Sequence, residues 1–128
     1  MSDFKKLKVW RKAHSLAMNV NQAGDAMRGN RHASLRTQMT RAALSIPTNI
    51  VEGTGHQSRR EFARFLRIAL SSGAELEYHL IVAHDIKAIS ANDYASLQSQ
   101  TVEVKKMLHG LLAVVAGNGG KKSPEVLT

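Results

Sequence analysis

The sequence predicts an all-α protein, specifically an antiparallel up-down-up-down four-helix bundle. The 128 residues contain only two prolines, and no strand-like alternation of apolar and polar residues persists. Four segments instead repeat apolar residues every three or four positions, and short connections join them. A chain of this length most economically forms one domain, which buries roughly two thirds of its unfolded surface. We therefore expect a bundle over residues 1–116 and a disordered tail over residues 117–128.

The first two helices are expected over residues 7–27 and from about residue 34 onward. The segment "RGNRHAS" separates them, and Ser34 is the predicted N-cap of the second helix. The apolar stripe of the first helix is Val9, Trp10, Ala13, Leu16, Ala17, Val20 and Met27. The stripe of the second helix is Leu35, Met39, Ala42, Ala43, Ile46, Ile50 and Gly53.

Pro47 lies in the middle of the second helix, where it offers no amide hydrogen to the carbonyl of Ala43. The apolar positions nevertheless keep their phase across the proline. Met39, Ile46 and Ile50 fall within about 40° of one another at 100° per residue. A break in the chain would give no reason for this match, so we expect one helix that is kinked at Pro47.

Hydroxyl groups close to the kink can satisfy the freed backbone groups, and Ser45 and Thr48 are the candidates. The second helix is expected to end where Gly53 and Gly55 permit left-handed dihedral angles.

The third helix has the clearest start signal in the chain. Ser58 is followed three residues later by Glu61, which together form a capping box. Its apolar stripe is Phe62, Phe65, Leu66, Ala69, Gly73, Leu76 and Leu80, and it should end near Ala88. The fourth helix begins at a weaker box, Ser90 with Asp93, and carries Tyr94, Leu97, Thr101, Val104, Leu108, Leu111 and Leu112.

Small residues recur on the second and third helices and permit their backbones to approach closely, either inside the bundle or between copies of it. They are Ala42, Ala43, Ser45, Ala69, Ser72 and Gly73.

The basic charge of the chain is unevenly distributed. The formal net charge is +8, and residues 1–41 contain nine Lys or Arg against two acidic residues. A surplus of this kind suits a polyanionic partner such as nucleic acid. With no cysteine, thiolate metal sites, disulfides and cysteine nucleophiles are excluded, which fits a cytoplasmic protein. No segment resembles a signal peptide or a membrane span, so no membrane association is expected.

Patterns typical of catalysis or cofactor binding are missing. The six histidines are dispersed, and neither a Glu-x-x-His pair nor a zincin motif occurs. The segment "GNGGKKS" lacks the spacing and the preceding strand of a phosphate loop. We predict no enzyme, no cofactor and no metal site.

Three arginines form a stripe on the third helix. Arg60, Arg64 and Arg67 are spaced four and three residues apart, roughly opposite the apolar face. Like charges at this spacing repel one another, and Arg59 and Arg60 also lie in a first turn, where the helix dipole disfavours cations. The stripe indicates either an anionic partner or pairing with glutamates of a neighbouring helix or subunit.

Three blocks of sequence together resemble the bacterial 23S rRNA intervening-sequence proteins, also called the S23 ribosomal protein family. The blocks are "LKVWRKAHSLA", "LRTQMTRAALSIPTNIVEG" and "SRREFARFLRIALSSGAELEYHL", within residues 4–112. The family often has Gly-Arg where this chain has Gly55-His56, and commonly Gly-Ser where it has Ser71-Ser72.

The resemblance implies an up-down bundle that assembles as a ring-like homopentamer without established catalytic residues. The family is also similar to the accessory protein of diversity-generating retroelements, a pentameric barrel that binds nucleic acid and a reverse transcriptase.

The leading hypothesis is therefore a non-enzymatic oligomer that binds RNA or DNA through phosphate contacts. The alternative is a scaffold or accessory subunit that docks an acidic protein, such as a nucleic-acid-processing protein. The predicted nucleic-acid-binding residues are Lys5, Lys6, Lys8, Arg11, Lys12, Arg60, Arg64 and Arg67.

Overall fold

The computed structural model describes residues 3–27 and 29–118, and this part of the chain contains four long helices and no strand. The helices are α1 (Lys8–Asp25), α2 (Ala33–Thr54), α3 (Arg59–Asp85) and α4 (Ala91–Ala113), with the short turns η1 (Phe4–Lys6) and η2 (Val114–Asn118) at either end of the series. The prediction of an all-α four-helix bundle is thereby confirmed. Of the predicted tail, residues 117–118 belong to η2 and residues 119–128 lie outside the described residues.

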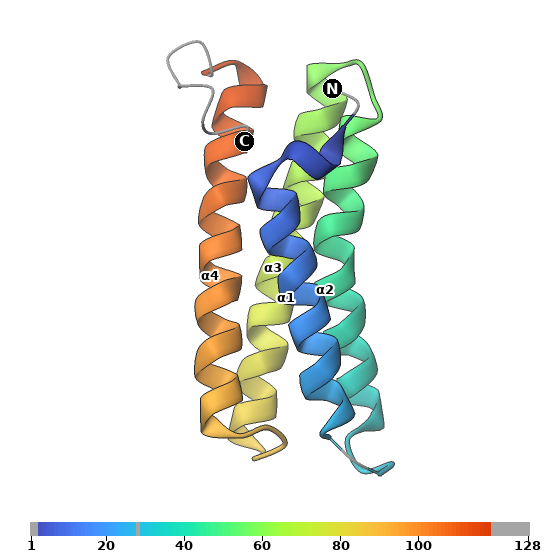
Figure 1. Ribbon diagram of the computed structural model, residues 1–128, viewed down its shortest axis with the longest axis vertical. Coiled ribbons are helices and arrows are strands. Elements are labelled where there is room, and N and C mark those ends of the chain that lie inside the picture. Colours follow the sequence, from blue (N-terminus) through green and yellow to red (C-terminus); the bar gives the residue numbers. More distant parts are fainter. Residues whose placement is uncertain (1–2, 28, 119–128) are drawn as a thin grey trace.

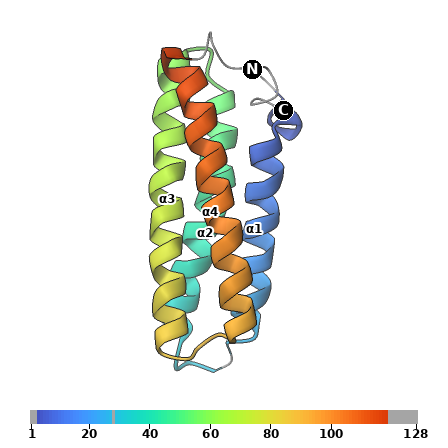
Figure 2. The same ribbon diagram turned by 90° about the vertical axis from the view of Figure 1, so that its left-hand side faces the viewer.

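The helices run alternately along the length of the molecule, as the colours of Figure 1 show. Each helix packs against the next one in the chain, and α4 also packs against α1. As a result, α1 and α3 lie diagonally opposite each other, which is clear in Figure 2. The starts of α1 and α3 and the ends of α2 and α4 therefore share one end of the bundle, which we call the η1 end.

The core follows the apolar stripes of all four helices, because each stripe faces the bundle axis. Its largest fully buried side chains are Leu16, Val20, Met39, Ile46, Ile50, Leu66, Leu76, Leu80, Thr101, Val104, Leu108 and Leu111. The hydroxyl of Thr101, the polar member of this set, donates to the carbonyl of Leu97 at 2.7 Å.

Two of the three predicted N-caps are confirmed. The amide of Glu61 donates to Ser58 Oγ at 3.2 Å, and the amide of Asp93 donates to Ser90 Oγ at 3.1 Å. These bonds satisfy amides that have no partner inside the helix. Ser58 and Ser90 are thus the N-caps of α3 and α4.

The third predicted N-cap, Ser34, is wrong, although α2 begins within one residue of it. The N-cap of α2 is His32, whose carbonyl accepts the first helical hydrogen bond, from the amide of Arg36 at 2.9 Å. The preceding residues form a turn closed by the amide of Ala33 on the carbonyl of Asn30, so helical geometry begins one residue before Ser34. Ser34 therefore lies inside the first turn, and no side chain caps this helix.

Helix α2 continues through Pro47, as the phase of its apolar stripe predicts. Two side chains supply hydrogen bonds to the backbone around the proline. Thr48 Oγ1 donates to the carbonyl of Leu44 at 2.8 Å, and Asn49 Nδ2 donates to the carbonyl of Ser45 at 2.8 Å. The predicted role of Thr48 as a backbone partner is consistent with this geometry, and the kink itself stays a prediction.

The expectation of left-handed glycines at the end of α2 is wrong. Gly53 lies within the helix, and Gly55 is its C-cap with right-handed dihedral angles, φ −75° and ψ −14°. Gly53 is needed because α3 packs closely against α2 at this position, and not because the chain turns there. A Cβ at this position would lie 2.7 Å from Cδ1 of Phe62 and 3.1 Å from Cβ of Phe65, both on α3.

The small residues of α2 and α3 meet inside the bundle. Ser45 Oγ and Ser72 Oγ lie 2.7 Å apart, and Asn49 Nδ2 donates to Ser45 Oγ at 3.0 Å. These bonds satisfy polar groups at a partly buried contact between two helices. Of the two explanations for the small residues, packing within one copy therefore accounts for this pair.

Candidate nucleic-acid interface

The first predicted basic set surrounds the start of α1. Lys5, Lys6, Lys8, Arg11 and Lys12 are all solvent-exposed, and we call them the N-terminal basic set. Arg11 holds the set together, because its Nη1 donates to the carbonyls of Lys5 and Lys6, each at 3.1 Å. This guanidinium thus fastens η1 to the first turn of α1.

One member of the N-terminal basic set is paired within the fold. Lys12 Nζ lies 3.5 Å from Glu103 Oε1 of α4, and the two side chains are 49% and 55% exposed. An ion pair this exposed contributes at most about 1 kcal/mol and is screened by salt. Breaking this ion pair therefore costs little free energy, and the ammonium of Lys12 is available to an anionic ligand.

Aromatic rings gather beside this basic set. The rings of Phe4 and Trp10 meet edge to face at 5.0 Å, and Trp10 stacks on His14 at 5.2 Å. The sequence contains few aromatic residues, and this grouping was not predicted from it. These ring contacts join η1 to the first two turns of α1.

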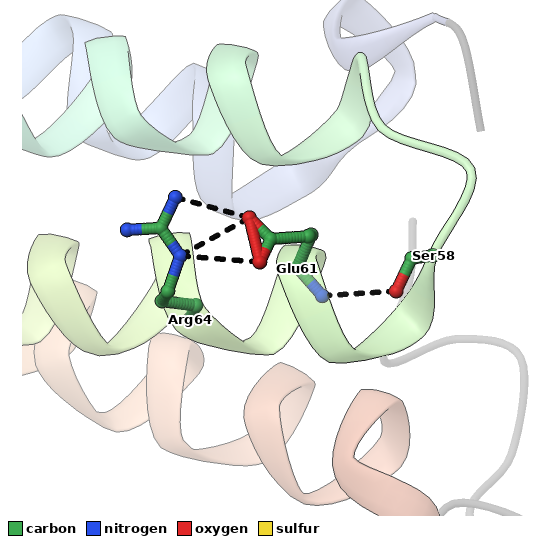
Figure 3. Close-up of polar contacts among 3 residues, drawn as sticks. All are labelled: Ser58, Glu61 and Arg64. Atoms are coloured by element: carbon green, nitrogen blue, oxygen red, sulfur yellow. Dashed lines mark hydrogen bonds and ion pairs between the residues drawn. The ribbon is translucent and has the colours of Figure 1, made fainter.

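The second predicted set lies on the first turns of α3, and its members have different surroundings. Arg64 is engaged within the helix, as Figure 3 shows: its Nε and Nη2 donate to Glu61 Oε1 at 3.1 and 3.0 Å. Its guanidinium also lies 4.5 Å from the ring centroid of Phe65. Arg64 is the least available of the three arginines for a ligand.

Hydrogen bonds from Arg64 lower the pKa of Glu61 below the ordinary value of a glutamate carboxyl. The charges of Arg64, His56 and Arg60 act in the same direction, whereas partial desolvation opposes them. Because the folded-state pKa is lowered, the contribution to stability is present above the unfolded-state pKa and is lost as the pH falls through the folded value. Near neutral pH, Glu61 therefore remains an anion that occupies Arg64.

Arg60 and Arg67 are the available pair of the stripe. Both are exposed, and neither has a hydrogen bond or ion pair within the described residues. Together with Arg59 they line a groove against η2, which we call the α3–η2 groove. The described residues that line it include no carboxylate, so nothing in its walls neutralises the two cations.

Arg59 is a site residue that the sequence did not predict. Its Nε donates to the carbonyl of Val115 at 3.1 Å, and its Nη2 donates to the carbonyl of Val114 at 2.6 Å. Carbonyls at the end of a helix carry partial negative charge, so they offset the unfavourable position of this cation in a first turn. One feature of the sequence could have identified Arg59 as a site residue. It is a cation in the first turn of a helix, where the helix dipole disfavours positive charge.

The two predicted sets share the η1 end and lie on α1 and α3, the two helices that are diagonal to each other (Figure 2). Lys12 of the N-terminal basic set pairs with Glu103 of α4, whereas Arg60 and Arg67 line a groove against η2, which follows α4.

Neither a metal site nor a membrane span is found within residues 3–27 and 29–118. No group of three or more His, Cys, Asp or Glu side chains there could hold a metal ion. None of the described helices combines the length and apolar character needed to cross a bilayer.

Comparisons with known proteins give a family match and similarity to solved structures. A model of the 23S rRNA-intervening sequence proteins matches residues 5–110. Among solved structures, the chain is similar to a protein of unknown function from the S23 ribosomal protein family of Bacteroides thetaiotaomicron VPI-5482, with a TM-score of 0.75 and 26% sequence identity. The similarity covers 81% of this chain and 97% of that one. No curated protein matches the chain.

Proposed function

We propose that this chain, which belongs to the 23S rRNA-intervening sequence protein family, binds RNA or DNA through its phosphates and does not act as an enzyme. The observation that carries the proposal is that Arg60 and Arg67 have no hydrogen-bond or ion-pair partner within the described residues and lie in the α3–η2 groove, whose described lining contains no carboxylate. Arg60 and Arg67 lie about two turns apart along α3, and the described residues that line the groove contain no carboxylate, so both guanidinium groups remain open to the oxygens of phosphate groups.

The N-terminal basic set supplies a second contact surface. Lys5, Lys6 and Lys8 belong to η1 and the start of α1, at the same end of the bundle as the groove, and Arg11 fastens η1 to the first turn of α1. Contacts of this type position a nucleic acid but read no base edges. The proposed binding is therefore salt-sensitive and weakly sequence-specific.

Removing the two available arginines is expected to weaken binding. In the double variant Arg60→Gln/Arg67→Gln, the affinity for a structured RNA should fall about tenfold or more at low salt, because two phosphate contacts are lost. The slope of log K against log[salt] should decrease in magnitude by about two. Fluorescence anisotropy of a labelled RNA hairpin over a series of salt concentrations measures both quantities.

A matched control removes two exposed positive charges elsewhere. Arg41→Gln/Lys87→Asn changes α2 and the α3–α4 connection, outside both basic sets, and should leave the salt slope unchanged. Equal weakening in both double variants would mean that net charge, and not the groove, attracts the RNA. Negligible binding of the unmodified chain at low salt would refute the proposed function.

We also propose that the protein is a homo-oligomer, with the pentamer implied by the family resemblance as the expected form. Exposed apolar side chains on α3 support a contact between copies: Ile68 is 36% exposed and Ile81 is 38% exposed. A ring of this kind would repeat each basic set on every copy and so multiply modest contacts.

Light scattering is expected to give a mass of about five times the 14.0 kDa of one chain. Replacing Ile68 and Ile81 by aspartate should reduce that mass, because a buried, unpaired carboxylate is costly at an interface. Met18→Asp, at a 45% exposed position of α1, is the matched control and should keep the assembly intact. A monomeric mass for the unmodified chain at micromolar concentration would contradict the proposal.

A further inference from the structure

Helix α1 carries an aromatic stack next to the N-terminal basic set. The rings of Trp10 and His14 lie nearly parallel, with an interplanar angle of 12° and centroids 5.2 Å apart. The two residues are four positions apart, so their side chains are neighbours on the same face of the helix. We call this pair the Trp10–His14 stack.

The inner ring of the stack is held in place by the fold. Trp10 is half-buried and packs against the hydrophobic core. The ring of Phe4 meets it edge to face at 5.0 Å. Arg11 in turn fastens η1, which contains Phe4, to the first turn of α1. An aromatic surface that is fixed in this way loses little conformational entropy when another flat group stacks on it.

The outer ring of the stack, His14, is exposed to solvent. Within the described residues it has no hydrogen bond or ion pair, and Trp10 is its only aromatic neighbour. Met18, four residues farther along α1, is 45% exposed, so the apolar surface continues beyond the ring. Since Trp10 lies along one face of the His14 ring, a flat group from solvent can extend the stack on the other face.

The surface around the stack is strongly basic. Residues 4–24 contain five Lys or Arg and no acidic residue. Arg11 lies three positions before His14, so the two side chains are neighbours on the helix surface. A ligand that fits both features has flat rings joined to negative charges. An unpaired nucleotide of a nucleic acid has this composition, because its base stacks on aromatic side chains while its phosphate contacts Lys and Arg.

A double helix cannot use the stack in the same way. In a duplex each base is paired and lies between its stacked neighbours, so its face is not open to a side chain. A duplex therefore reaches the basic side chains with its phosphates alone. Phosphate contacts do not distinguish unpaired from paired nucleotides by their bases, whereas a stacking contact does.

We propose that the Trp10–His14 stack binds an unpaired base of RNA or DNA, so that this end of α1 recognises single-stranded segments. The base stacks on the ring of His14, and the phosphates beside it contact the N-terminal basic set. This inference rests on the proposed nucleic-acid binding and names the form of nucleic acid recognised at one of its two contact surfaces. It uses neither Arg60 nor Arg67, so the two proposals are tested by different variants.

Replacing His14 by leucine tests the inference, because leucine keeps Trp10 covered but has no flat face. In His14→Leu, the affinity for an RNA strand of about ten nucleotides should fall about fivefold or more, and the affinity for a blunt duplex of equal length should change by less than about twofold. Stacking releases no counterions, so the slope of log K against log[salt] should stay the same. Fluorescence anisotropy of the labelled strand and duplex measures both quantities. Equal weakening for strand and duplex would overturn the inference.

Two further variants separate the flat ring from the other properties of His14. His14→Phe keeps a flat ring and removes the imidazole, and it should retain the affinity for the strand within about twofold. His109→Leu makes the same replacement at an exposed position of α4 and should leave both affinities unchanged. A loss in His14→Phe as large as that in His14→Leu would overturn the inference, as would equal losses in His14→Leu and His109→Leu.

Trp10 supplies an optical signal, because it is the only tryptophan of the chain. Its fluorescence should be quenched when the RNA strand is added, since a base then extends the stack to which its indole ring belongs. The duplex should quench it less at equal saturation. Equal quenching by the strand and the duplex would contradict the inference.

The unmodified chain separates this inference from the proposed function. If it binds neither the strand nor the duplex at low salt, the proposed function fails and this inference fails with it. If it binds both and His14→Leu weakens neither, only this inference fails. Arg60→Gln/Arg67→Gln should weaken binding of the strand and the duplex alike, because the contacts that it removes are to phosphates.

Discussion

Replacing Leu66 by alanine is expected to lower the free energy of unfolding by about 2–5 kcal/mol. Leu66 is fully buried on α3, where it packs among the apolar stripes of the bundle. The truncation removes apolar surface and leaves a cavity that neighbouring helices can fill only in part. Chemical denaturation followed by circular dichroism measures the change.

Leu44→Ala is the matched control, because it removes the same atoms from a side chain that is 53% exposed on α2. Its effect should lie within about 0.5 kcal/mol of zero, as is usual for surface substitutions. Equal losses for the two variants would contradict the burial assigned to Leu66. An unchanged m-value would show that both variants unfold from the same compact state.

The second large effect is expected at the contact between α2 and α3. Gly53→Val should destabilise the fold by about 1–3 kcal/mol, since the added side chain meets the buried ring of Phe62. The β-branched side chain has few rotamers within a helix and so cannot turn away from Phe62. Thermal and chemical unfolding both report this change.

Gly55→Ala serves as the control and also tests the conformation at the end of α2. Gly55 has right-handed dihedral angles, and a Cβ there would meet its nearest heavy atom, the carbonyl oxygen of Glu52, at 3.4 Å. Alanine should therefore be neutral or stabilise the fold by up to about 1 kcal/mol, because it restricts the unfolded chain. A clear loss of stability would indicate a left-handed conformation at this position, as the sequence alone suggested.

The elements that the sequence predicted correctly depend on neighbours within one or two turns. Ser58 and Ser90 cap their helices because the accepting hydroxyl and the donating amide are three residues apart. The continuation of α2 through Pro47 was likewise visible in the spacing of the residues around it. Local geometry and a shared apolar face are both encoded in residue order.

The errors arose where a long-range contact determines the role of a residue. Gly53 was interpreted as a turn residue, whereas the approach of Phe62 from the next helix explains it. Ser34 was assigned as an N-cap, but the turn that precedes α2 starts the helix earlier. Residue type alone does not distinguish a glycine needed for a turn from one needed for close packing.

For the candidate site as well, the sequence predicted which residues are present but not which contacts they make. The sequence identified every basic residue of the two sets, yet it did not reveal that Arg64 is occupied by Glu61 or that Arg60 and Arg67 are unpaired. It also did not predict the bonds from Arg59 to the carbonyls of η2. Whether each arginine is paired depends on which elements pack together in the fold, such as the start of α3 and η2.

By itself, the sequence determined the fold class, two of the three predicted helix caps and the family of this protein, because periodicity and short motifs are properties of neighbouring residues. Only the tertiary structure decided which cations remain available, why Gly53 is a glycine, and that Nδ1 of the buried His79 has no hydrogen-bond partner within the described residues. The physical reason is that the packing of antiparallel helices brings together residues far apart in the chain, and burial and pairing depend on those contacts.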